Sequence, residues 1–211
     1  MSRSPVLALF AGLSLFAVAA GASAGGVADQ FRGGAFGLSW SADKNAIQAK
    51  YPGGTWDKHE SGADRYCAPS RQPLLKLPAQ HQTRELCFIM GLDKTMGAAT
   101  ARLDASLPSL LAVVNRSRTM FGDFDAVKRD DNAIQSKYTY MLWLKDAPII
   151  AVVSSANGDD GKPNMVAFSV ADEAIFLDSE SQTMTARGNP AYLRDHSPDP
   201  KVRAFLGRGR P

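Results

Sequence analysis

The chain contains only two cysteines, Cys67 and Cys87, and three prolines lie in the segment between them, at positions 69, 73 and 78. Proline fixes φ, removes a backbone donor and pushes the preceding residue towards extended conformations, so this segment is expected to be an irregular loop. A bond between the two sulfurs would close the loop into a ring. The chain-entropy model for a ring of this size gives about 3 kcal/mol of stabilisation.

The first residues indicate whether the two cysteines are oxidised. Arg3 precedes an apolar run over 6–20, and the residues ending at Ala24 fit the small-x-small pattern that signal peptidase reads. The run is short for a membrane span and has no basic stop-transfer flank. Residues 1–24 are therefore predicted to be a signal peptide, and the mature protein is predicted to be periplasmic or secreted. In such a compartment two lone cysteines form a disulfide, with free thiols or a metal-ligand pair as the alternatives.

The mature chain has the length of one domain, which is expected to span 25–180. Beyond this point the apolar residues no longer recur at helix or strand spacing, and the proline, glycine and basic content of 181–211 is typical of a flexible tail. From Gln182 onwards there are six basic and two acidic side chains, so this segment carries a formal charge of about +4 and accounts for the positive net charge of the whole chain, +3. Such a tail can contact an anionic membrane surface weakly or remain solvated. The charge pattern does not indicate a nucleic-acid partner.

Two helices are expected from capping residues and helical periodicity. The first follows Ser41, has Asp43 in its first turn, and stops at the Pro-Gly-Gly sequence beginning at Pro52. The second covers 107–121, where apolar side chains recur at spacings of three, four and seven. The expected buried face of this second helix holds Leu107, Leu110, Leu111, Val114 and Phe121.

A short entry strand and about six strands of a sheet are expected from alternating or short apolar runs. These runs are 31–40 (a short entry strand), 55–66, 85–90, 98–104, 134–144, 149–155 and 164–170. The last two flank a turn rich in Gly, Asn and Asp, which is typical of a hairpin. The predicted fold class is α+β, with an antiparallel sheet of about six strands, two helices packed on one face and one disulfide-closed loop.

Recognisable catalytic motifs are missing from the sequence. A Gly-x-Ser-x-Gly elbow, a phosphate-binding loop, and His-x-x-x-His or Cys-x-x-Cys spacings do not occur. We therefore predict no catalytic residue, no cofactor and no enzymatic activity. As an alternative, four side chains could hold a copper or zinc ion across the loop, although an exposed polar strand explains them equally well. They are Asp57, His59, Glu60 and His81.

The loop between the cysteines contains the best candidate for a binding surface. Leu74, Leu75, Lys76 and Leu77 lie between two prolines, in a segment that the disulfide would pre-organise. A rigid, extended, apolar segment loses little entropy on binding, which favours contact with a partner protein. The alternative is that these leucines fold back and cover the sheet.

Several short motifs give the chain a resemblance to known groups of exported proteins. The sequence 36–39 (FGLS), followed by a short helix ending in Tyr-Pro-Gly at 51–53, resembles the opening of many small exported bacterial proteins of uncharacterised function. Phe121–Gly122 and Trp143 continue this pattern. The chain is more distantly similar to SmpA/OmlA-type outer-membrane assembly proteins and to the β-lactamase-inhibitor type, both built from helix-plus-sheet modules. The SmpA/OmlA type carries a lipid-anchoring cysteine at the cleavage site, where this chain has Gly25.

Together these features predict an exported, non-enzymatic binding or accessory protein of the bacterial envelope. It is expected to contact another envelope or secreted protein through the disulfide-closed, proline-rich loop. The alternative is a periplasmic metal-binding protein, or an enzyme without a recognisable motif.

Overall fold

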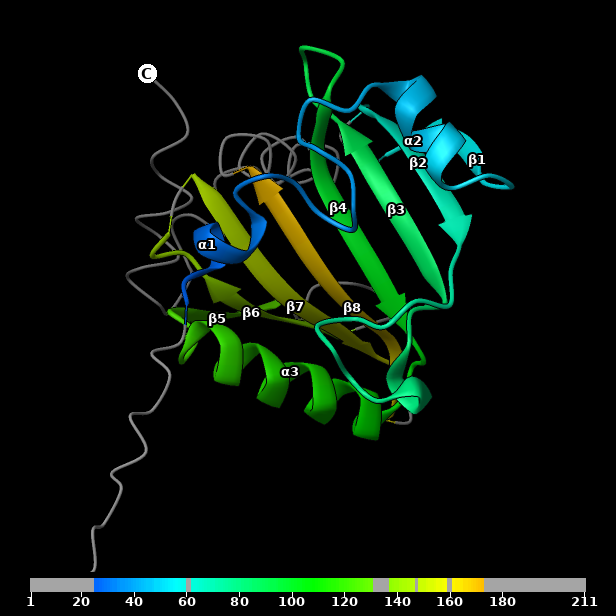
Figure 1. Cartoon of the computed structure of the whole chain (residues 1–211). Coiled ribbons are helices and arrows are strands. Elements are labelled where there is room, and N and C mark those ends of the chain that lie inside the picture. Colours follow the sequence, from blue (N-terminus) through cyan, green and yellow to red (C-terminus); the bar gives the residue numbers. More distant parts are fainter. Residues whose placement is uncertain (1–24, 60–61, 131–136, 147, 159–160, 173–211) are drawn as a thin grey trace, which may run out of the picture.

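A computed structural model describes residues 25–59, 62–130, 137–146, 148–158 and 161–172 (Figure 1). The predicted signal peptide, the predicted tail and Glu60 lie outside these residues. Within them the chain forms one antiparallel sheet of eight strands and three α-helices. The strands are β1 (Thr55–Lys58), β2 (Asp64–Pro69), β3 (Glu85–Met90), β4 (Met96–Leu103), β5 (Ala126–Asp130), β6 (Lys137–Trp143), β7 (Ile149–Asn157) and β8 (Pro163–Asp172). The helices are α1 (Val27–Phe31), α2 (Lys44–Lys50) and α3 (Leu107–Phe121), with a 3-10 turn at Ala79–His81.

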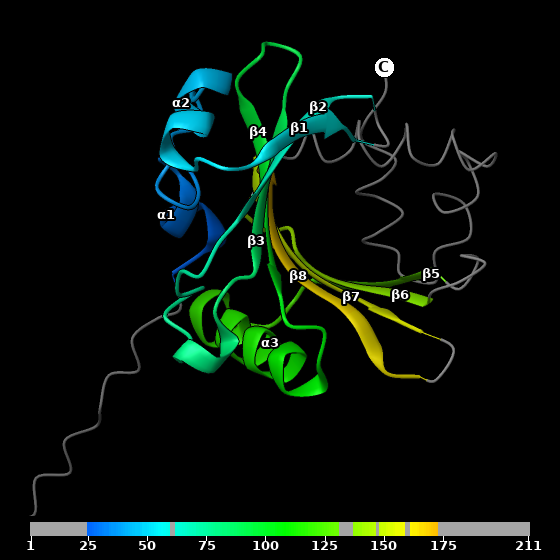
Figure 2. The same ribbon diagram turned by 90° about the vertical axis from the view of Figure 1, so that its right-hand side faces the viewer.

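The sheet consists of two four-stranded meanders joined at their inner strands. Its strand order is β1-β2-β3-β4-β8-β7-β6-β5, so β4 pairs with β8 at the centre. Helix α2 precedes the first meander and α3 precedes the second, and Figure 2 shows the helices on one side of the sheet. The chain therefore repeats a unit of one helix and four strands. The predicted antiparallel α+β class is confirmed, whereas the prediction of about six strands and two helices was wrong.

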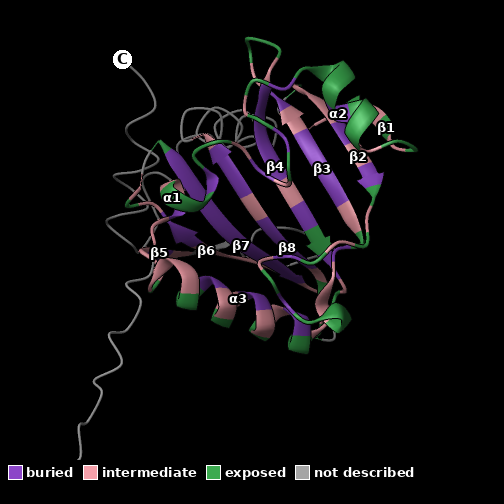
Figure 3. Ribbon diagram, in the orientation of Figure 1, coloured by how far each residue is buried: buried purple, intermediate pink, exposed green. Residues whose placement is uncertain are grey.

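Alternate residues of the strands form the main core on the helix side. Tyr66, Phe88 and Phe168 are fully buried there, together with Ile47 of α2 and Val27 of α1. This period of two follows from the pleat, which turns successive side chains to opposite faces. Figure 3 shows the resulting bands of buried residues along the strands.

Helix α3 starts and stops where the sequence predicts, but its buried face differs. The Ser106 side chain accepts a hydrogen bond from the Ser109 amide, and Gly122 (φ 83°) ends the helix. Leu107 and Leu111 are 55% and 52% exposed, so the prediction that they are buried was wrong. Leu110, Val114 and Phe121 are half-buried and pack against the core as predicted, and three further residues of the helix are fully buried against the sheet. These buried residues are Ser109, Val113 and Ser117.

The segment before α2 was also predicted incorrectly. Residues 32–43 form turns with a single isolated bridge between Ala35 and Leu38, and not an entry strand. Gly34 and Phe36 have positive φ, which an extended strand does not allow. Helix α2 is capped by Asp43 and not by Ser41, because the Asp43 side chain accepts the hydrogen bond from the Ala46 amide and the helix begins at Lys44.

The second face of the sheet carries the side chains that point away from the helices. On β6 and β7 it is apolar, with Ile150, Val152 and Leu142 in one cluster. Towards β1 it becomes polar, because Arg65, Glu85 and other charged or hydroxyl side chains alternate with the core residues. No described helix lies on this face (Figure 2).

Candidate functional site

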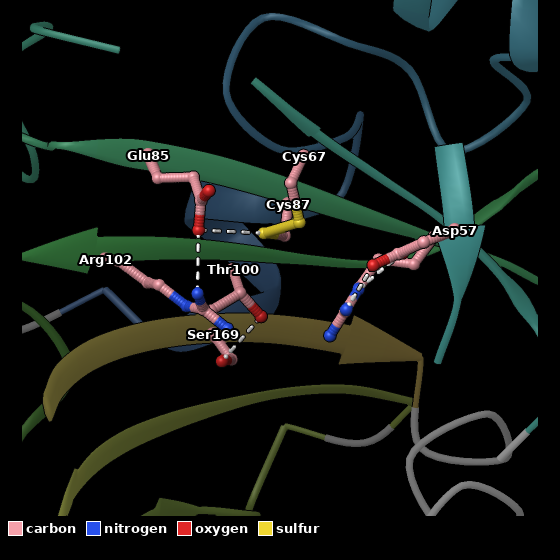
Figure 4. The surroundings of a disulfide bond; sticks show 8 residues. Asp57, Cys67, Glu85, Cys87, Thr100, Arg102 and Ser169 are labelled. Atoms are coloured by element: carbon pink, nitrogen blue, oxygen red, sulfur yellow. Dashed lines mark hydrogen bonds and ion pairs between the residues drawn. A yellow bond between two sulfur atoms is a disulfide. The ribbon is translucent and has the colours of Figure 1, made fainter. Parts of the chain in front are cut away.

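Cys67 and Cys87 form the predicted disulfide, with an S–S distance of 2.07 Å. The two residues lie directly opposite one another in the register of β2 and β3. The bond therefore joins two strands that are already paired. It closes the loop at its base, where the two cysteines are 20 residues apart in the sequence. It lies on the second face of the sheet (Figure 4).

Polar side chains surround this disulfide. Glu85 Oε2 lies 3.4 Å from Cys87 Sγ and accepts a 2.8 Å hydrogen bond from Arg102 Nη1. The hydroxyls of Thr100 and Ser169 are 2.9 Å apart on the two neighbouring strands (Figure 4). The disulfide thus lies beside an ion pair and a hydroxyl pair, with Cys67 half-buried and Cys87 only 3% exposed.

The loop that the disulfide closes is anchored on the helix side. Leu74 and Leu77 are buried core residues, Leu75 is half-buried against the core, and Lys76 is exposed. The buried Thr83 hydroxyl donates a 2.8 Å hydrogen bond to the Ser70 hydroxyl across the loop. Two of the four predicted binding residues therefore cover the sheet, as the alternative interpretation expected. Protein binding stays a prediction for the other two, Leu75 and Lys76.

The tip of this loop is a tight turn, so the prediction of an extended segment between Leu74 and Leu77 was wrong. The Leu77 amide donates to the Leu74 carbonyl at 2.7 Å, and the two central residues, Leu75 and Lys76, have φ of 50° and 59°. Residues other than glycine, asparagine and aspartate rarely adopt positive φ, because Cβ approaches the following carbonyl. Arg116 Nε of α3 donates a 2.7 Å hydrogen bond to the Leu75 carbonyl and so holds the turn in place.

Of the four alternative metal ligands, Glu60 lies outside the described residues, and the structure does not bring the other three, Asp57, His59 and His81, together. Asp57 Oδ1 accepts a 2.9 Å hydrogen bond from Arg65 Nε, and this bond lowers the pKa of Asp57. His81 Nδ1 lies 3.3 Å from Ser109 Oγ of α3, on the helix side of the sheet. Within the described residues, the three side chains whose ligand atoms approach closely enough to share an ion are Cys67, Glu85 and Cys87.

The contact between His81 and Ser109 resembles that of a catalytic serine with its general base, but Ser109 is buried and has a structural role at the start of α3. Ser109 is only 2% exposed, and its hydroxyl also accepts a 3.0 Å hydrogen bond from Ser106. Asp104 is paired with Arg84 at 2.6 and 2.7 Å, and these hydrogen bonds lower its pKa. Ser106 and Ser109 therefore cap α3, and the contact from His81 holds the disulfide-closed loop against the start of this helix.

Asp125 is a buried carboxylate with a structural role. Its side chain is 4% exposed, and Oδ2 accepts hydrogen bonds from the Leu144 amide (2.7 Å) and the Lys145 amide (3.0 Å). Burial opposes ionisation of this group, but these bonds and the Lys145 ammonium, 2.9 Å from Oδ1, outweigh it and lower the pKa of Asp125. The carboxylate ties the start of β5 to the end of β6.

The tip of the β3–β4 hairpin presents the most exposed large apolar side chain among the described residues. Leu92 is 96% exposed. The turn beneath it is held by the Gly91 amide bonded to the Thr95 carbonyl at 2.8 Å, and by Asp93, which accepts bonds from the Thr95 amide (3.0 Å) and hydroxyl (2.8 Å). The hydrogen bonds from the Thr95 amide and hydroxyl lower the pKa of Asp93, so they favour the charged carboxylate that accepts them.

An open cleft of about 1350 Å³ adjoins this hairpin. It is bounded by the hairpin, by the start of α2 and by the turn between β1 and β2, and Figure 1 shows the hairpin tip beyond the end of the sheet next to α2. The Met96 amide donates a 2.9 Å hydrogen bond to the Ala42 carbonyl, which ties the hairpin to the segment before α2. The apolar part of the lining includes Trp40, Ile89, Met90, Leu92, Met96, Pro148 and Ile149.

Charged residues on one wall of the cleft are paired with one another. The Asp64 carboxylate lies 2.5 Å from both Lys44 Nζ and Lys58 Nζ, and these two hydrogen bonds lower its pKa to about 2. Lys44 Nζ also lies 4.9 Å from the centre of the Trp56 ring. This network fixes the β1–β2 hairpin against the start of α2.

Comparison with protein-family models finds no match, and comparisons with the curated proteins and with the solved structures find none either. In the described part of the chain, no helix is long and apolar enough to cross a membrane. The functional interpretation therefore rests on the residues themselves.

Proposed function

We propose that this chain is an exported binding or accessory protein of the bacterial envelope, and that it contacts another protein with the tip of the β3–β4 hairpin. The observation that carries this proposal is the 96% exposure of Leu92 on a turn locked by Asp93 and Thr95. The disulfide is compatible with an exported protein.

A single exposed leucine is common on protein surfaces and would not suffice alone. Here the leucine projects from a rigid turn at the mouth of a cleft that contains apolar side chains, Trp40 and Ile149 among them. A partner that receives Leu92 in a pocket can therefore extend into the cleft as well. Because the turn is already ordered, little conformational entropy is lost when it binds.

The turn around Leu75 and Lys76 is a second candidate for the same function. Two consecutive left-handed residues that are not glycine are held there by Arg116. Such a conformation costs stability and persists where the surrounding structure imposes it, often at functional sites. In this case the disulfide-closed loop would contact a partner protein, as the sequence predicts. Leu75 and Lys76 would make the contact, and the buried Leu74 and Leu77 would anchor the turn.

A photo-crosslinking amino acid at position 92 tests the proposal in cells that export the protein. The same group at position 76 tests the second candidate, and at position 111 it is a matched control, since Leu111 is also an exposed leucine but lies on α3. We expect one partner protein to be crosslinked from position 92 and not from position 111. Equal crosslinking of partner proteins from positions 92 and 111 would refute the proposal. A crosslinked partner from position 76 alone would show that the disulfide-closed loop, and not the hairpin, makes the contact.

A further inference from the structure

We propose that the reduced form of this protein binds a thiophilic divalent metal ion, such as Zn²⁺, through Cys67, Cys87 and Glu85. The disulfide and the metal ion would then exclude one another, because both use the same two sulfur atoms. This proposal is independent of the hairpin contact proposed above.

The geometry of the two strands brings the three ligands together. Cys67 and Cys87 are register partners in β2 and β3, so their side chains point to the same face. Glu85 lies two residues before Cys87 in β3 and therefore shares that face. The candidate ligand atoms lie within 4.8 Å of one another, and Figure 4 shows the Glu85 carboxylate next to Cys87.

The ligand types suit zinc. Thiolate sulfur binds Zn²⁺ at about 2.3 Å and carboxylate oxygen at about 2.0–2.2 Å, and a site with three protein ligands leaves a fourth position for water. Arg102 holds the Glu85 carboxylate beside the sulfurs through its 2.8 Å bond. Cys87 is only 3% exposed, whereas the Glu85 side chain is 34% exposed and Cys67 is half-buried, so an ion would enter from the side of Glu85 and Cys67.

The site opens only when the disulfide is reduced. An external dithiol supplies the two electrons and two protons, and becomes a disulfide itself while Cys67 and Cys87 become thiols. One Zn²⁺ ion then replaces the two thiol protons, and the carboxylate of Glu85 completes the protein ligands. In the reverse direction, an external disulfide accepts the two electrons and becomes a dithiol, the Cys67–Cys87 bond forms again, and the ion is released because both thiolate ligands are lost.

Cobalt titration of the reduced protein tests the proposal. The purified protein is reduced with dithiothreitol, freed of reductant without oxygen, checked for its fold by circular dichroism and titrated with Co²⁺. We expect thiolate-to-cobalt absorption that saturates at one equivalent and is displaced by Zn²⁺. The oxidised protein and Cys67→Ser should lack this absorption.

Two carboxylate variants separate a built site from a simple pair of thiols. Glu85→Gln should weaken Co²⁺ binding about tenfold or more. Asp57→Asn, on the same face but outside the ligand group, should leave it unchanged. The proposal is overturned if the reduced protein gives no absorption, if Glu85→Gln binds as tightly as the wild type, or if the reduced chain binds equally well when unfolded in urea.

Discussion

Replacing Lys76 with glycine should stabilise the protein, because the lysine is held in a left-handed conformation. Lys76 has φ of 59° and is exposed, so its side chain contributes little packing. Glycine adopts positive φ without the contact between Cβ and the carbonyl. Turns with two positive φ values are accordingly dominated by Asn-Gly and similar pairs, whereas this turn holds Leu75 and Lys76.

The expected gain follows from two opposing contributions. A left-handed residue other than glycine costs about 1–2 kcal/mol. Glycine makes the unfolded chain more flexible, which costs about 0.5–1 kcal/mol. The free energy of unfolding of Lys76→Gly should therefore rise by about 0.5–1 kcal/mol.

Urea unfolding, followed by tryptophan fluorescence, measures this change. Lys76→Ala is the matched control, because it removes the same side chain but keeps Cβ and should give no gain. Lys94→Gly repeats the experiment at φ of 64° in the β3–β4 hairpin and should also stabilise. The reasoning is refuted if Lys76→Gly is no more stable than Lys76→Ala while the urea dependence of both is unchanged.

Three further predictions concern the core, the disulfide and the charged network. Leu74→Ala should lower the free energy of unfolding by about 2–5 kcal/mol, because Leu74 is 1% exposed in the core; urea unfolding measures it. Replacing both Cys67 and Cys87 with alanine should lower the same quantity by about 3 kcal/mol, because the unfolded chain loses its ring. Asp64, with a pKa of about 2 against 3.8 normally, should stabilise the protein above about pH 4 and lose this effect as the pH falls towards 2. Urea midpoints of wild type and Asp64→Asn between pH 2 and 7 should therefore differ at neutral pH and converge near pH 2.

Each of these predictions has an outcome that contradicts it. If Leu74→Ala costs under 0.5 kcal/mol, a typical value for a surface site, the loop is not anchored as described. An unchanged stability without the cysteines would show that the ring does not restrain the unfolded chain. Parallel pH curves for wild type and Asp64→Asn would show that the two lysine contacts do not favour the charged carboxylate.

Features with a local signal were predictable from the sequence. Helix α3 has a serine cap and a glycine stop, the β7–β8 hairpin has a turn rich in Gly, Asn and Asp, and the signal-like leader implied an oxidised cysteine pair. Features that depend on packing were not predictable. The rotation of α3, which buries Ser109, Val113 and Ser117 and exposes Leu107 and Leu111, depends on how the helix packs against the sheet. The five-residue helix α1 has too few residues to show a periodic pattern.

The candidate site was predictable only in part. The loop prolines indicated an irregular loop but not the tight turn at its tip, and nothing in the sequence distinguishes Leu74 and Leu77, which are buried, from Leu75, which is half-buried. Leu92 lies in a predicted turn between strands, where an apolar residue among glycine, aspartate and lysine was the available signal. Its exposure and the adjoining cleft depend on how the hairpin packs against α2, which a local pattern does not contain.

The affinity of the purified protein for the partner crosslinked from position 92 tests the central claim most directly. Leu92→Ser should weaken binding about tenfold or more, the loss expected for an apolar anchor, and should leave the free energy of unfolding nearly unchanged. Leu111→Ser, which removes an exposed leucine from α3, should bind as the wild type does. Equal binding by the wild type and Leu92→Ser would contradict the account.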